Sequence, residues 1–327
     1  MTAIRALMSH IVDYAGLFPP AALAMETTVR NFSAYRTGPH AWMLGRLICP
    51  TARMKEFAEV YSALEDAERG PAPWHLSALG RGGDDGYGFM ANLDEDLADI
   101  RDLSDRFSGR LVVDAFECRV PTMLVGASDG KDLRELANQA TRKLHECAPG
   151  SVATFFEIPF VGDWRQNVVA AVAAIARHNA EMPAGQPASG VKIRMGGVKA
   201  EMFPSAEQVA CFIDACRRCR VAFKATAGLH HPIRHYAGSV ETKMHGFVNV
   251  FGGSALVRAA DGDGTLLCRL LDDESARSFA LADDALMWGE LRATAEQIAA
   301  ARRDLATSFG SCSFTEPIED LEALGWL

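Results

Sequence analysis

The sequence alternates short apolar runs, rich in Val, Ile and Phe, with longer stretches that have a helical period. This alternation is typical of parallel strands that are joined by crossover helices. The expected strands are 11–14, 42–48, 74–79, 111–116, 152–158, 191–195, 221–226 and 247–251. The expected helices lie near 24–36, 51–67, 93–106, 131–146, 164–180, 205–218, 232–244 and 253–260. Eight strands with eight crossovers predict a closed (β/α)8 TIM barrel of the α/β class.

The alternation stops near residue 262, and this divides the chain into two parts. Residues 1–262 are expected to form the barrel and to be the catalytic domain. Residues 263–327 are expected to be a helical extension, with one long helix over 283–305 and a short helix at the end. Such an extension would pack on the barrel or at a subunit interface, so we expect a homo-oligomer.

Charge and composition exclude several classes of partner. The net charge is −9, and we find no cluster of Lys and Arg that would neutralise a phosphate backbone, so we expect no nucleic-acid partner. No apolar run approaches the roughly 18 residues that a membrane helix requires. Eight cysteines are too dilute for a disulfide scaffold, which favours a reducing compartment. We therefore expect a cytoplasmic protein that acts on a small molecule.

Two lysines occupy neighbouring expected strands. Side chains alternate along a strand, so Lys192 and Arg194 lie on one face of strand 191–195 while its apolar residues face the helices. The same alternation turns Lys224 into the barrel. Two ammonium groups on strands about 4.8 Å apart repel each other, and partial desolvation adds to this effect. We therefore expect one lysine to have a lowered pKa and to attack a carbonyl group as a neutral amine, which gives a Schiff base.

Three carboxylates are candidates for proton transfer beside these lysines. Asp114 is the first choice and Asp13 the second, and Glu157 is a further candidate. Formation of a carbinolamine and cleavage of a carbon–carbon bond each need an acid or a base. The alternative is that the lysines pair with Asp114 and Glu157 in a polar layer that has only a structural role.

A histidine-rich segment follows the seventh expected strand. His230 and His231 are expected to reach the mouth of the barrel, where they would contact substrate or transfer protons. Together with Glu157 they could instead bind zinc or another divalent metal. They could also be ordinary loop histidines.

A small-residue segment follows the eighth expected strand. Gly252, Gly253 and Ser254 could bind an anion through free backbone N–H groups at a helix start, or they could simply permit a tight turn. Arg194 could clamp the same anion.

These residues and their order resemble the deoxyribose-phosphate aldolase family of class I aldolases, over roughly residues 10–260. The resemblance rests on Asp13, Asp114, Glu157, the Val-Lys192 pair followed by Gly-Gly, the run Val-Ala-Phe-Lys224-Ala-Thr-Ala-Gly228, and Gly252-Gly253-Ser254. It implies that Lys192 forms the Schiff base and that Lys224 tunes it. It further implies that Asp114 relays protons and that the segment 252–254 holds a phosphate.

The chain departs from that family at the expected substrate pocket. Ile193-Arg194-Met195 replaces small polar residues after the strand-six lysine, and the loop 229–235 is richer in histidine. These departures predict a different substrate.

Three hypotheses follow from the sequence. The first is a lyase of the class I aldolase type that acts on a small anionic carbonyl substrate without a cofactor. The second is a metal-dependent barrel enzyme that uses Glu157, His230 and His231. The third is a barrel without catalytic activity that serves as a binding or assembly subunit through residues 263–327.

Overall fold

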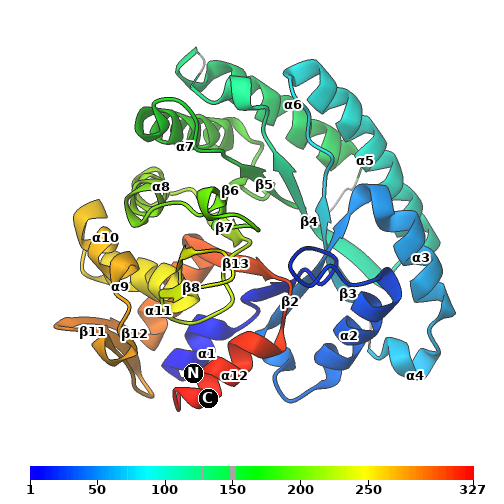
Figure 1. Cartoon of the computed structure of the whole chain (residues 1–327). Coiled ribbons are helices and arrows are strands. Elements are labelled where there is room, and N and C mark those ends of the chain that lie inside the picture. Colours follow the sequence, from blue (N-terminus) through cyan, green and yellow to red (C-terminus); the bar gives the residue numbers. More distant parts are fainter. Residues whose placement is uncertain (72, 127, 148–151) are drawn as a thin grey trace.

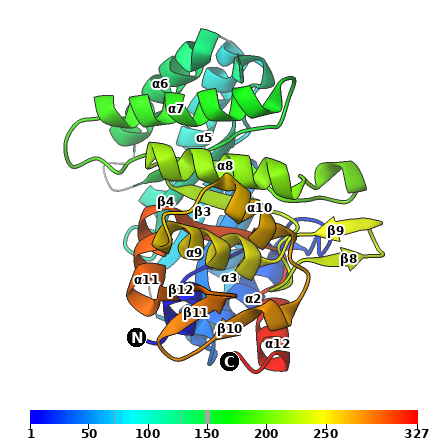
Figure 2. The ribbon, with the colours of Figure 1, turned by 90° about the vertical axis from the view of Figure 1, so that its left-hand side faces the viewer.

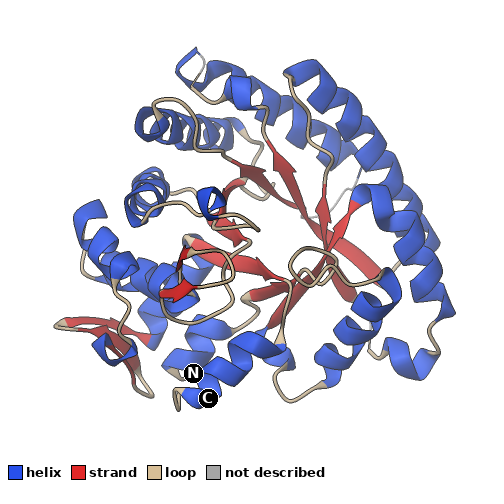
Figure 3. Cartoon of the chain, in the orientation of Figure 1, coloured by secondary structure: helices blue, strands red, loops and turns tan. Residues whose placement is uncertain are grey.

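A computed structural model describes residues 1–71, 73–126, 128–147 and 152–327. Eight parallel strands form a closed barrel, and helices cover its outside (Figures 1 and 3). Around the barrel the order is β1-β13-β7-β6-β5-β4-β3-β2. The strands are β1 (Val12–Tyr14), β2 (Leu44–Pro50), β3 (Trp74–Leu79), β4 (Leu111–Arg119), β5 (Ala153–Glu157), β6 (Gly190–Arg194), β7 (Phe223–Thr226) and β13 (Ala306–Ser311). The predicted fold class, a (β/α)8 barrel, is confirmed.

The core lies between the strands and the surrounding helices. Val191 and Ile193 of β6 are fully buried on the outward face of the strand, as their alternation with charged residues predicts. Several helices begin at a side-chain cap, as α8 does at Ser205, whose hydroxyl accepts from the Gln208 backbone N–H while the Gln208 side chain bonds back. The helices are α1 (Ala3–Met8), α2 (Met25–Thr37), α3 (Met54–Ala63), α4 (Asp66–Arg69), α5 (Gly86–Arg106), α6 (Lys131–Cys147), α7 (Trp164–Glu181), α8 (Ala206–Cys219), α9 (Gly253–Ala259), α10 (Gly264–Asp272), α11 (Ala295–Asp304) and α12 (Thr315–Ala323).

The eighth strand is not where the sequence predicts it. Residues Val248–Gly252 form a turn of π-helix that continues into α9, and β13 closes the barrel between β1 and β7. A short apolar run fits a buried helix as well as a buried strand, and here Phe251 packs against Phe309 of the true strand at 5.6 Å between ring centroids. The barrel therefore extends beyond residue 262, because residues 263–327 supply its closing strand.

Two helices expected from the sequence are replaced by small antiparallel sheets. The segment 232–244 contains a hairpin of β8 (His235–Ala237) and β9 (Thr242–Met244), which projects from the barrel in Figure 2. The segment expected as one long helix begins instead with a three-stranded sheet and ends with α11. Gly289 turns this sheet with a φ of +57°, a conformation that interrupts a helix. The sheet strands are β10 (Phe279–Leu281), β11 (Ala285–Trp288) and β12 (Leu291–Thr294).

Hydrogen bonds connect the N-terminal and C-terminal segments of the chain. Figures 1 and 2 place the termini near each other, and Arg302 of α11 donates to the carbonyl oxygens of Leu7 at 2.8 Å and Ser9 at 3.1 Å. The same guanidinium donates to Ala306 O at 2.5 Å, and burial lowers the pKa of Arg302 to about 9. The C-terminal segment is thus an integral part of the barrel.

Among the described helices, none is long and apolar enough to cross a membrane.

Candidate active site

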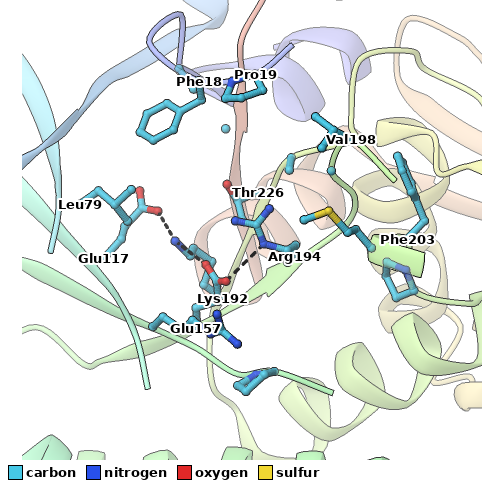
Figure 4. A pocket seen from close by; sticks show the side chains of 18 of the residues that line it. Phe18, Pro19, Leu79, Glu117, Glu157, Lys192, Arg194, Val198, Phe203 and Thr226 are labelled. Atoms are coloured by element: carbon cyan, nitrogen blue, oxygen red, sulfur yellow. Dashed lines mark hydrogen bonds and ion pairs between the residues drawn. The ribbon is translucent and has the colours of Figure 1, made fainter. Parts of the chain in front are cut away.

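A cavity of about 750 Å³ opens at the carboxyl ends of the barrel strands. Charged residues from the ends of β4, β5 and β6 form part of its wall, and apolar residues from the loops after β1 and β6 form another part (Figure 4). Phe18 and Pro19 lie across the cavity from Lys192 in this view. Barrels of this fold carry their active sites at this end, because the loops that follow the strands meet there.

Six charged side chains of alternating sign run from the barrel interior into this cavity. In order they are Asp13, Lys224, Glu117, Lys192, Glu157 and Arg194. Glu117 and Glu157 each lie between two cations, each lysine lies between two carboxylates, and Asp13 ends the row beside Lys224. The charges balance, so the row can be buried at a much lower cost than an isolated charge.

Lys192 lies in the middle of this row, at the wall of the cavity. Its Nζ is 3.0 Å from Glu117 Oε2 and 2.9 Å from Glu157 Oε2, and its side chain is only 2% exposed. Burial alone would lower the pKa of Lys192, but the two carboxylates outweigh burial and raise this pKa well above its usual value. The expected lowering of a lysine pKa by repulsion from Lys224 is therefore wrong for Lys192, although the two residues are direct register partners.

Glu117 is the central carboxylate, and it is not among the site residues predicted from the sequence. It forms ion pairs with both lysines and accepts a hydrogen bond from Ser77 Oγ at 2.5 Å. Burial opposes its ionisation, yet the charges of Lys224 and Lys192 hold its pKa far below the usual range. β4 continues to Arg119, three residues beyond the expected end, so the expected strand stops before it reaches Glu117.

Asp114, the expected proton relay, is not part of the row of charges around the two lysines. The pairing of β3 with β4 skips it, since Val113 pairs with Leu76 while Ala115 pairs with Ser77. Its carboxylate instead binds Arg46 Nε at 2.5 Å and His75 Nδ1 at 2.8 Å, near the start of the strand. This irregularity shifts the alternation by one residue, so Glu117 contacts the lysines and Asp114 does not.

Asp13 and Lys224 form the sealed end of the row, and neither is part of the cavity wall. Both side chains are fully buried, with Lys224 Nζ 2.6 Å from Asp13 Oδ2. Asp13 also accepts from Ser308 Oγ and from the Arg46 backbone N–H, each at 2.7 Å. Gly45 allows this approach, since an added Cβ there would lie 2.3 Å from Asp13 Oδ1.

Glu157 and Arg194 form the open end of the row, and both line the cavity. Burial opposes ionisation of Glu157, but the charge of Lys192 lowers its pKa overall. Arg194 Nε is 3.5 Å from Glu157 Oε1, and the Arg194 side chain is 47% exposed. The structure thus brings together Lys192, Glu157 and Arg194 as the sequence predicts (Figure 4).

The two histidines face the C-terminal helix. His230 lines the cavity, and its Nδ1 is 3.0 Å from Glu316 of α12, while His231 Nδ1 is 2.6 Å from Asp320 of the same helix. Glu157 has Lys192 and Arg194 as its partners, so the expected metal-binding trio is not assembled. Within the described part of the chain, no group of three or more His, Cys, Asp or Glu residues is arranged to hold a metal ion.

The segment 252–254 does not form an anion site at the cavity. All three residues are buried inside the helical turn that joins α9, and Ser254 Oγ donates to the Val250 carbonyl at 2.6 Å. None of them lines the cavity. The prediction failed because it depended on a strand at 247–251 that does not exist.

Comparison with known proteins gives one kind of similarity. No protein-family model matches the chain, and no curated protein matches it in sequence. Among solved structures, the chain is similar to the apo-form of a protein from Toxoplasma gondii ME49 that is provisionally named a deoxyribose-phosphate aldolase. The match has a TM-score of 0.48 and 13% sequence identity, and it covers 98% of this chain and 96% of the other. The structural resemblance expected from the sequence is thus found, and at this identity it concerns the fold alone.

Proposed function

We propose that the chain is a lyase of the class I aldolase type, in which Lys192 forms a Schiff base with a small anionic carbonyl substrate. The observation that carries this proposal is the position of Lys192 Nζ, which lies at the cavity wall between Glu117 and Glu157. A lysine buried at the mouth of a barrel, with a carboxylate on each side, combines a nucleophile with the groups that move its proton.

Lys192 and Glu157 together can carry out the proton transfers that Schiff-base formation requires. Lys192 starts as an ammonium ion, and Glu157 accepts one proton so that the neutral amine attacks the carbonyl carbon. The resulting carbinolamine loses its hydroxyl as water, with the proton returned from Glu157. The sum is an ammonium ion plus a carbonyl giving an iminium ion plus water, with no net change in charge. The carboxylates that raise the pKa of Lys192 therefore also stabilise the iminium cation.

Glu157 and Glu117 have different parts in this scheme. Glu157 lines the cavity and can reach a substrate atom, which suits the proton carrier. Glu117 is shared with Lys224 and Ser77, so it serves as a fixed negative charge that orients the lysine. Once formed, the iminium withdraws electrons from the adjacent carbon, which permits cleavage or formation of the neighbouring carbon–carbon bond.

Borohydride trapping tests the proposal directly. The protein is incubated with acetaldehyde, pyruvate, glyceraldehyde 3-phosphate or succinic semialdehyde, reduced, digested and analysed by mass spectrometry. We expect a secondary-amine adduct on the peptide that contains Lys192, with at least one of these compounds. The variant Lys192→Met should form no adduct at this peptide, while Lys55→Ala, which changes an exposed lysine of α3, should behave as the unmodified protein.

Two results would contradict the Schiff-base mechanism. One is that every compound leaves Lys192 unlabelled. The other is that labelling is confined to surface lysines and is equal in the unmodified protein and in Lys192→Met.

A further inference from the structure

Arg119 and Arg194 are two guanidinium groups in the cavity wall, and they stand on either side of β5. They are the last residues of β4 and β6. Arg119 is the register partner of Glu157, and Glu157 is the partner of Lys192, so these three residues form one row across the sheet. Because neighbouring strands lie about 4.8 Å apart, the backbone of Arg119 is roughly 10 Å from that of Lys192.

These two guanidinium groups retain free hydrogen-bond donors. Across the described residues, no ion pair or side-chain hydrogen bond engages Arg119, which is exposed to the cavity. Arg194 is half exposed, and within the described part of the chain its side chain has only a long contact with Glu157 and one bond to Gly196 O at 3.3 Å. The other cation of the wall, Lys192, is held by two carboxylates.

We infer that Arg119 and Arg194 together bind the anionic end of the substrate while its carbonyl group reaches Lys192. This inference rests on the proposed function and narrows it to short-chain aldehydes or ketones with a terminal carboxylate or phosphate group. A guanidinium presents two parallel N–H donors to such an oxyanion, and two of them on separate strands fix its position. Lys192 lines the same cavity, two strands from Arg119 and two residues before Arg194, so a substrate of a few carbon atoms suffices to connect the anion with the carbonyl carbon.

The remaining charges of the wall agree with this assignment. Glu157 is already neutralised by Lys192, so it adds little repulsion at the site of the anion. Glu201, in the short turn Ala200–Met202 after β6, also lines the cavity and would repel an anion. It therefore offers a control of opposite sign in the same cavity.

Binding of probes without a carbonyl group tests the anion site independently of any Schiff base. Succinate and inorganic phosphate are titrated by calorimetry into the unmodified protein, Arg119→Gln and Arg194→Gln. We expect at least one probe to bind, and each substitution to weaken it by about tenfold, the effect of losing a charge-assisted hydrogen bond. Arg142→Gln, an exposed site on α6, should leave binding unchanged, and Glu201→Gln should leave it equal or tighter. The preferred probe identifies the anion as carboxylate or phosphate.

Binding to the unmodified protein that both arginine variants retain would overturn the inference, and so would failure of both probes to bind. Borohydride trapping of matched aldehydes, with and without an anionic group, distinguishes a failure of the anion site from a failure of the Schiff-base proposal. Succinic semialdehyde should label Lys192 at lower concentration than butanal, or glyceraldehyde 3-phosphate at lower concentration than glyceraldehyde, and the arginine variants should remove this preference. If arginine-dependent probe binding persists and no aldehyde labels Lys192, the anion site stands and the Schiff-base mechanism falls. If aldehydes label Lys192 but the arginine variants keep the same preference as the unmodified protein, the Schiff-base mechanism stands and the anion site falls.

Discussion

The two buried lysines each lie between two carboxylates, but Lys224 is enclosed in the barrel while Lys192 borders the cavity. Lys224 lies between Asp13 and Glu117, and the side chains of Lys224 and Asp13 are fully buried away from the cavity. Lys192 lies between Glu117 and Glu157 at the wall of a cavity of about 750 Å³. One end of the row is thus closed to water and substrate, and the other end is open to both.

This difference separates a structural role from a chemical one. A charge that is sealed with its counter-ions contributes to stability only as long as every member stays in place. A charge that borders a cavity can exchange protons with substrate and solvent. We therefore expect substitutions at the closed end to affect mainly the free energy of unfolding and substitutions at the open end to affect mainly chemistry.

Lys224→Met should show the largest effect on stability. It leaves the buried Asp13 without its cation and removes one of the two cations at Glu117. Removing one partner from a buried ion network costs about 3–5 kcal/mol in the free energy of unfolding. Urea unfolding followed by circular dichroism measures this, with Lys55→Met as the exposed control. A loss of less than about 1 kcal/mol would show that the closed end is not an interdependent network.

Lys192→Met should be clearly less destabilising than Lys224→Met, with an expected loss of about 1–3 kcal/mol. Glu117 keeps Lys224, and Glu157 keeps Arg194 and can be hydrated from the cavity. The same urea experiment compares the two variants under one set of conditions. The reverse order of stability would remove the distinction between a closed and an open end.

The sequence predicted seven of the barrel strands and both lysines, because alternation of apolar and charged residues is a local property. It could not identify β13, which lies far along the chain, after an antiparallel sheet and α11. The run 247–251 competed for the same place, since a short run of four apolar residues around Asn249 suits a buried helix and a buried strand equally.

The carboxylate partners show a second limit of sequence reasoning. Strict alternation favours Asp114 as long as β4 is regular, but the strand pairing skips that residue. A skip in register depends on how two strands fit together, so neither strand alone reveals it. Glu157 lies on a regular strand, and its inward orientation was predicted correctly.

Gly45→Ala should disturb the closed end without removing any charge. The added Cβ would lie 2.3 Å from Asp13 Oδ1, which must then leave the backbone N–H of Arg46. We expect a loss of about 1–3 kcal/mol in the free energy of unfolding, the cost of a buried acceptor with a lost partner. Gly86→Ala is the matched control, because nothing lies within 4 Å of its added Cβ. Equal stability of the two variants would contradict the tight packing around Asp13.

Glu316→Gln, which changes the partner of the cavity residue His230, should give the smallest effect on stability, and only at acidic pH. The hydrogen bond with His230 lowers the pKa of Glu316 in the folded protein, although burial opposes this. A carboxylate with a lowered folded-state pKa stabilises the fold fully above its unfolded pKa and loses this contribution as the pH falls through the folded value.

The free energy of unfolding of Glu316→Gln should therefore vary less with pH between about pH 5 and pH 3 than that of the unmodified protein. Glu319→Gln, at an exposed position of the same helix, should keep the full dependence. Because Glu316 is partly exposed, the difference should be a fraction of one proton in the slope, far below the effect of Lys224→Met. A steeper acid dependence in Glu316→Gln than in Glu319→Gln would mean that the His230 contact does not favour the folded state.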